Sequence, residues 1–194
     1  MATAVTLAVT VTTTMALGIR HITDFAGFDH MLFLLALTLP LIWKQWKTLL
    51  LWVSYFTIGH SISLALAANG WVKIPADFVE WSIALTIALT VLLHMATSFK
   101  VKKFHGIMGL VFGLVHGLGF GSYYALIAQS DRFWWAWLPF NLGIELGQLM
   151  VVAALVFVYS VALALGMKQR TYQWLLSGVV LTLSAQMLIE RMPF

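Results

Sequence analysis

Six long apolar segments follow one another along this chain of 194 residues, and each is long enough to cross a membrane. They cover about residues 26–43, 48–69, 79–98, 105–128, 137–166 and 171–190. The hydrocarbon core of a bilayer is about 30 Å thick, so a helix of about 20 apolar residues spans it. Only 9% of the residues are charged, against about 25% in soluble domains. The sequence therefore predicts an all-α, polytopic membrane bundle with six core transmembrane helices.

The N-terminal segment, residues 1–19, is apolar and rich in threonine, and the sequence leaves its role open. It lacks the basic region that begins a cleaved signal peptide. It is either a short seventh span or a helix lying on the outer face of the membrane. Residues 20–194 are expected to form a single transmembrane helical domain, because the short connections leave no room for a soluble one.

Basic residues are concentrated in the first, third and fifth connections. These residues are Lys44, Lys47, Lys100, Lys102, Lys103, Lys168 and Arg170. Cytoplasmic loops of membrane proteins are enriched in Lys and Arg, so these connections are predicted to be cytoplasmic. We therefore expect a multi-pass protein of the inner (cytoplasmic) membrane with an extracytoplasmic C-terminus. Its expected partners are the lipid bilayer and a metal ion, with no nucleic acid; an oligomer is left open.

Four of the apolar segments carry polar or ionisable groups that are costly at membrane depth. These are Gly27-Phe28-Asp29-His30, Gly59-His60-Ser61, His116-Gly117, and Asn141 with Glu145 and Gln148. An ionisable side chain inside a membrane segment normally faces the protein interior and marks a functional site. Four such clusters on four segments predict one polar site or pathway inside the bundle.

The chemistry of these groups favours a divalent transition metal. The chain has no cysteine, so thiolate ligands are excluded. Neutral imidazole suits nickel, zinc, copper and iron, and carboxylates add charge to such a site. Asp29 and His30 are neighbours on a helix and cannot both point the same way. Asp24 is a candidate acceptor that would orient a metal-binding histidine.

Helical rise places the candidate groups at two depths. His60 and His116 lie about 18 Å and 16 Å from the cytoplasmic ends of their segments, at about 1.5 Å per residue, and so near the midplane. His21, Asp24, Asp29 and His30 are expected near the outer mouth. The sequence leaves open whether these two levels form one site or two stations. His94 and His105 are expected toward the cytoplasmic side, near a basic rim of Lys100, Lys102 and Lys103, and are left out of the site.

Glycines four residues apart predict close contacts between helices. They are Gly109, Gly113, Gly117 and Gly121 on one segment and Gly143 and Gly147 on the next. Such a row of small residues lets the backbone of a neighbouring helix approach. His116 lies beside this row, so it is expected at a helix contact and not in lipid. Ser82, Thr86 and Thr90 form a milder stripe whose hydroxyls can bond back to their own helix.

These motifs together resemble the HupE/UreJ family of membrane proteins, in particular its second branch. The matching pieces are Gly18–Ile22, Gly27–Leu35, Phe56–Leu64, Phe112–Phe120 and Phe140–Gln148, in the family's order. The resemblance implies a permease for nickel or a related metal. It implies that His21, Asp29, His30, His60 and His116 handle the metal and that Glu145 supports them. Asp24, Ser61, Asn141 and Gln148 are further supporting or pathway candidates.

Three metal-related functions remain open from the sequence, beside a non-metal role such as a proton relay. Only the second of the three would make the chain an enzyme. The first is a metal permease with nickel or zinc as its ion. The second is an intramembrane zinc hydrolase that uses His30, His60 and His116 with Asp29, Ser61 and Glu145. The third is a metal chaperone or sensor in the membrane. A hydrolase needs one compact site, and His30 and His60 rings more than about 8 Å apart would exclude a mononuclear zinc, since Zn–N is about 2.1 Å.

Overall fold

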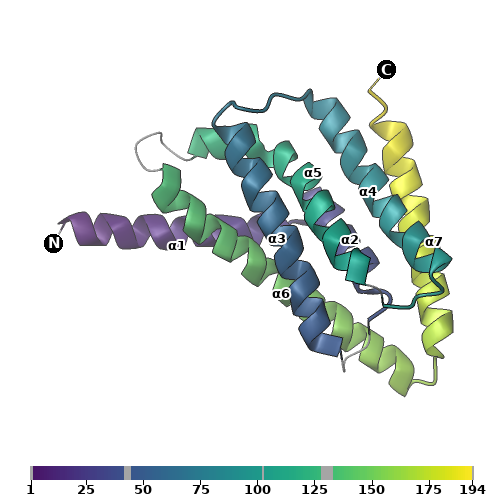
Figure 1. Cartoon of the computed structure of the whole chain (residues 1–194). Helices are drawn as coiled ribbons and strands as arrows, with labels where there is room; N and C mark the ends of the chain where they lie inside the picture. Colours follow the sequence, from purple (N-terminus) through teal and green to yellow (C-terminus); the bar gives the residue numbers. More distant parts are fainter. Residues whose placement is uncertain (1, 42–44, 102, 128–132, 194) are drawn as a thin grey trace.

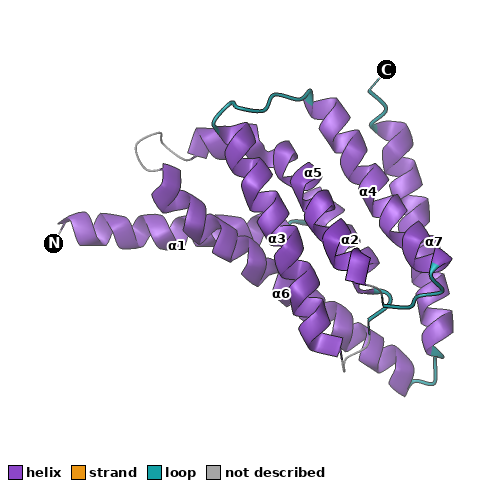
Figure 2. Cartoon of the chain, in the orientation of Figure 1, coloured by secondary structure: helices purple, strands orange, loops and turns teal. Residues whose placement is uncertain are grey.

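The computed structural model describes residues 2–41, 45–101, 103–127 and 133–193, and these residues form helices joined by short loops (Figures 1 and 2). The helices are α1 (Ala2–Thr23), the short 3-10 helix η1 (Phe25–Gly27), α2 (Asp29–Thr38), α3 (Trp46–Ala68), α4 (Ala76–Ala96), α5 (Lys103–Ile127), α6 (Phe133–Ala164) and α7 (Gln169–Glu190). The described residues contain no strand, so the all-α prediction is confirmed. Lys44 and Lys102, used in the topology prediction, lie outside the described residues.

Five helices, α3 to α7, are long and apolar enough to cross a membrane, and they match the second to sixth predicted spans. The first predicted span, 26–43, is wrong in length, because the helix found there is α2 with 10 residues. It ends at Thr38, two residues before Pro40, which has no amide proton to continue the helical hydrogen bonds. Ten residues rise about 15 Å, which is half of a hydrocarbon core.

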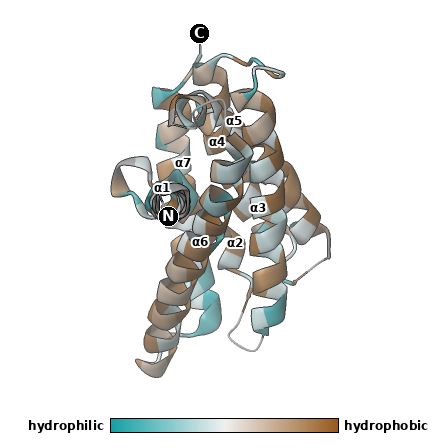
Figure 3. Ribbon diagram, turned by 90° about the vertical axis from the view of Figure 1, so that its left-hand side faces the viewer, coloured by the Kyte–Doolittle hydropathy of each residue, from teal (hydrophilic) through white to brown (hydrophobic). Residues whose placement is uncertain are grey.

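Helix α1 runs across the long helices instead of alongside them (Figure 1), and Figure 3 views it end-on. It continues past residue 19 through Arg20 and His21 to Thr23, so the apolar N-terminal segment and the first polar motif share one helix. It is not among the five helices that qualify as spans in the described part of the chain. Its C-terminal half therefore carries His21 into the bundle from the side.

The predicted glycine contacts are confirmed. A Cβ atom on Gly113 would overlap the carbonyl oxygen of Phe56, and one on Gly117 would overlap the carbonyl oxygen of His60, so α5 and α3 pack backbone to backbone. Gly143 of α6 meets the carbonyl oxygen of Met15 on α1 in the same way. His116, the residue before Gly117, is only 1% exposed, as expected for a side chain at a helix contact.

The two ends of the bundle differ in their charged residues. The connection between α3 and α4 and the C-terminus lie at one end, and the connections from α4 to α5 and from α6 to α7 lie at the other (Figure 1). We call the first the Arg191 end, since it holds Arg191 and Glu80. We call the second the lysine end, since it holds Lys47, Lys100 and Lys168.

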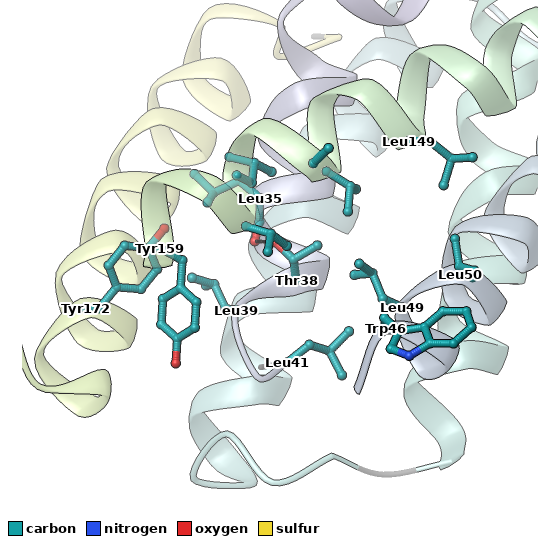
Figure 4. A pocket seen from close by; sticks show the side chains of 14 residues that line it. Leu35, Thr38, Leu39, Leu41, Trp46, Leu49, Leu50, Leu149, Tyr159 and Tyr172 are labelled. Carbon is teal, nitrogen blue, oxygen red and sulfur yellow. Dashed lines mark hydrogen bonds between the residues drawn. The ribbon is translucent and has the colours of Figure 1, made fainter. Parts of the chain in front are cut away.

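An apolar cavity of about 190 Å³ opens between α2, α3, α6 and α7 toward the lysine end (Figure 4). Leucine side chains such as Leu35, Leu49 and Leu149 make up half of the residues in its wall, with Tyr159 and Tyr172 at one side. Its lining contains neither a histidine nor a carboxylate. This cavity therefore offers no site for the metal chemistry that the polar motifs predict.

Candidate metal centre

Three histidines from three helices meet inside the bundle. His21 lies in the last turn of α1, His30 in the first turn of α2 and His60 in the middle of α3. One ring nitrogen from each lies within 4.8 Å of the others. The ring centroids of His21 and His30 are 4.6 Å apart, and each is 5.8 Å from that of His60. The two depths inferred from the sequence therefore coincide, because α1 enters from the side and α2 begins inside the bundle.

His116 of α5 is the fourth member of this cluster, with its ring centroid 5.4 Å from that of His30. Its Nε2 lies 3.1 Å from the hydroxyl oxygen of Thr86. The single hydroxyl proton of Thr86 is donated to the carbonyl oxygen of Ile83 at 2.7 Å. Nε2 of His116 must therefore carry the proton and donate it to Thr86. This leaves the lone pair on Nδ1, which has no hydrogen-bond partner among the described residues.

The cluster holds several buried nitrogen atoms without hydrogen-bond partners in the described chain. They are Nε2 of His21, Nε2 of His30, both ring nitrogens of His60 and Nδ1 of His116. Buried polar atoms are nearly always bonded, so such a concentration in one place calls for a ligand. Neutral imidazoles with free lone pairs are good ligands for nickel, zinc and copper.

The spacing of the nitrogens is compatible with a single ion. In a tetrahedral zinc site with Zn–N of about 2.1 Å, the nitrogens are about 3.4 Å apart. The three ligand atoms lie within 4.8 Å of one another, so their separations exceed that ideal by about 1.4 Å at most. The separation of 5.8 Å between the His30 and His60 rings is well inside the 8 Å limit that a mononuclear site sets.

A polar cavity of about 600 Å³ connects the cluster with the Arg191 end of the bundle. Its inner wall includes His21, His30 and His116. Its outer wall carries charged side chains, namely Arg20, Asp24, Asp29, Glu80 and Arg191. An ion in solution can therefore approach the imidazoles from this side without crossing the apolar core.

Asp29 does not join the histidines. Its carboxylate accepts two hydrogen bonds from the Arg191 guanidinium, at 2.8 and 3.2 Å, while Arg191 also lies 3.9 Å from Glu80. Burial alone would lower the pKa of Arg191, but the hydrogen bond and charge of Asp29 raise it above its ordinary value. Asp29 and His30 thus point to different partners, as expected for helix neighbours, and the expectation of Asp29 at the metal is not met in this arrangement.

The polar residues of α6 face α3 and not the cavity. Ser54 donates to Glu145 at 2.7 Å, Thr57 donates to Gln148 at 2.6 Å, and Ser61 donates to Asn141 at 2.5 Å. These three bonds form a seam that ties α3, the helix of His60, to α6. Ser61, Glu145 and Asp29, the groups expected to serve a hydrolase, are each bonded elsewhere, so the structure does not gather them around the histidines.

Two residues of this region were missed by sequence reasoning. Arg191 follows the last span, at the end that the charge distribution assigns to the outside. A basic residue there is an exception to the positive-inside rule, and this exception was the available signal. Thr86 was noticed only as part of a stripe that bonds back to its own helix, and its oxygen also serves His116.

Comparison with known proteins gives a single kind of match. The model of the family described as HupE / UreJ protein matches residues 1–191, which include all of the described helices. No curated protein and no solved structure matches the chain.

Proposed function

The chain belongs to the HupE/UreJ family, and from that premise we propose that it is a membrane permease for a divalent transition metal, nickel or zinc. Family membership and five apolar helices make it a membrane protein linked to metal handling. The observation that carries the finer proposal is the group of three imidazoles whose ligand atoms lie within 4.8 Å of one another. In this proposal His21, His30 and His60 bind the ion, and His116 supplies a fourth nitrogen.

The direction of access follows from the charges at the two ends. The lysine end is cytoplasmic by the positive-inside rule, so the cavity at the Arg191 end opens to the outside. We therefore propose a protein of the inner membrane with its C-terminus outside. Asp24 and Glu80 on the cavity wall would attract a cation toward the imidazoles.

The seam between α3 and α6 supports the site without touching the ion. Asn141, Glu145 and Gln148 hold α3 through Ser61, Ser54 and Thr57. The position of His60 depends on that helix. We therefore assign these residues a positioning role, and we assign none of them a role in hydrolysis.

The test is metal binding and transport by the purified full-length chain. Wild-type protein in detergent is expected to bind Ni²⁺ or Zn²⁺, and proteoliposomes are expected to take the ion up. His60→Ala and His116→Ala are expected to abolish or strongly reduce both. Gln186→Ala is the control, because Gln186 is exposed on α7, away from the cluster, and donates a hydrogen bond to Glu190.

The outcomes separate the candidate functions. Uptake that is unchanged in His60→Ala and His116→Ala would refute the permease. Binding that is lost in those variants, with no uptake by the wild type, would instead indicate a chaperone or sensor.

A further inference from the structure

A second pair of histidines lies at the lysine end, apart from the four already described. His94 is in the last turn of α4 and His105 in the first turn of α5. Their ring centroids are 4.4 Å apart, with the ring planes at 82°. The two side chains are 1% and 2% exposed, so both are buried although they lie near the lysine end.

The turn between α4 and α5 explains why they are buried. Ser98 and Phe99 adopt positive φ angles of 52° and 58°, a conformation that makes a tight reversal. The amide of Phe99 donates to the carbonyl oxygen of His94 at 2.7 Å. This reversal folds the end of α4 directly against the start of α5, and the two imidazoles meet between the helices.

The surroundings of the pair are those of a small ligand site. Both ring nitrogens of His94 are buried without a hydrogen-bond partner in the described residues. A cavity of about 10 Å³ touches His94, His105 and Met108, and about that volume accommodates one water-sized particle. Trp52 lies parallel to the His94 ring, at 8° and 6.3 Å, and edge-on to His105 at 5.4 Å, so the rings are held in place.

We propose that His94 and His105, with the Met108 thioether beside them, form a second metal-binding station. Two imidazoles and a thioether are ligands that borderline and soft transition metals accept. None of these three residues belongs to the first cluster. The binding itself is independent of the proposed permease, while its role as an inner station on the ion's route rests on that function.

The positions of the two stations on α4 and α5 agree with such a route. His105 and His116 are 11 residues apart on α5, which is about three turns, so they share one face about 16 Å apart. Thr86, the partner of His116, and His94 share one face of α4, with two turns between them. The two helices therefore carry both stations along a common interface.

An aromatic layer separates the stations. Phe33 and Phe56 both lie 5.1 Å, ring to ring, from His116. Phe33 also contacts Phe56 at 4.7 Å and Phe112 at 6.3 Å. Phe112 itself lines the small cavity beside His94. An apolar constriction with a binding station on either side is an arrangement by which channels and carriers gate passage.

The experiment counts ions bound to the full-length chain with Ni²⁺ as the probe. The wild type is expected to bind two Ni²⁺ ions. The double variant His21→Gln/His60→Gln is expected to keep one, and His94→Gln/His105→Gln is expected to keep the other. X-ray absorption of the first double variant, which leaves only the inner station, is expected to show imidazole ligands.

The count also distinguishes failure of this proposal from failure of the permease. If the wild type binds one ion and His21→Gln/His60→Gln binds none, the inner station is refuted. If His94→Gln/His105→Gln does not fold, the ion count of His21→Gln/His60→Gln decides alone: one bound ion supports the inner station, and none refutes it. The transport rate of His94→Gln/His105→Gln is expected to fall by about tenfold or more. If this variant keeps the ion at the first cluster and transports as fast as the wild type, the place of the inner station on the route is refuted.

Discussion

Replacing Thr86 by valine tests whether His116 is a metal ligand, because Thr86 determines which nitrogen of that ring carries the proton. Its hydroxyl donates to Ile83, so its oxygen can only accept from Nε2 of His116, at 3.1 Å. A metal on Nδ1 keeps the proton on Nε2. In the Thr86→Val variant that proton has no acceptor in the ion-bound state, and the cost falls on binding.

The size of the effect follows from the burial of the pair, since Thr86 is 6% exposed and His116 is 1% exposed. A buried donor left without its partner costs about 1–3 kcal/mol. At about 1.4 kcal/mol for each factor of ten, the dissociation constant for Ni²⁺ rises by about 5- to 150-fold. Loss of partners that orient metal-binding histidines typically costs about 10- to 100-fold, which is the same range.

The measurement is the Kd for Ni²⁺ of purified protein, by calorimetric titration in detergent. Thr86→Ser restores the acceptor and is expected to bind nearly as the wild type does. Thr182→Val is the matched control, since that exposed hydroxyl donates to Gly178 of its own helix. A folded Thr86→Val variant whose Kd stays within about twofold of the wild type would refute the assignment of Nδ1 of His116 as a ligand.

Three further substitutions test the packing and the charges around the cluster. Gly117→Ala puts a Cβ into the carbonyl oxygen of His60 and is expected to destabilise the fold by about 1–3 kcal/mol or more. Gly178→Ala is the control, because a Cβ there meets nothing within 4 Å. An equal fall in melting temperature for both variants would contradict the contact between α5 and α3. Arg191→Gln leaves Asp29 without its cation and is expected to lower the free energy of unfolding by about 1.5–3 kcal/mol, and Arg191→Lys is expected to have an intermediate effect. An unchanged melting temperature in Arg191→Gln would argue against the Asp29–Arg191 ion pair. Ser61→Ala removes the bond to Asn141 and is expected to cost about 1 kcal/mol while leaving Ni²⁺ affinity unchanged; loss of Ni²⁺ binding in a folded variant would place Ser61 in the site.

Local sequence patterns predicted the helical class, five of the spans and the buried position of His116. Hydropathy reports how many consecutive residues tolerate lipid, and it is reliable for α3 to α7. Glycine spacing reports where backbones approach, and it correctly marked the contact of α5 with α3. These properties depend on neighbours along one helix, which is why the sequence contains them.

The compact shape of the cluster could not be predicted in the same way. Depth was estimated from the ends of segments, which assumes that each helix starts at a membrane surface. Helix α2 starts inside the bundle and α1 crosses it, so His30 and His21 lie beside His60 and not above it. The pairing of Asp29 with Arg191 joins residues 162 positions apart, and no periodicity of either helix encodes it.

The shortness of α2 determines where the membrane voltage falls across this protein. On the Arg191 side of its first turn, the open cavity of about 600 Å³ brings the aqueous phase down to the imidazoles. In the proposed orientation, the electric field would be weak across that wet half and concentrated between the aromatic layer and the lysine end. Moving one elementary charge through the full potential involves about 2.3 kcal/mol at about 100 mV. At the same potential a divalent ion therefore gains up to about 4.6 kcal/mol over the inner half alone. For the proposed permease, loading of the first cluster would therefore be insensitive to voltage, and passage beyond Phe112 would be the step that the membrane potential drives.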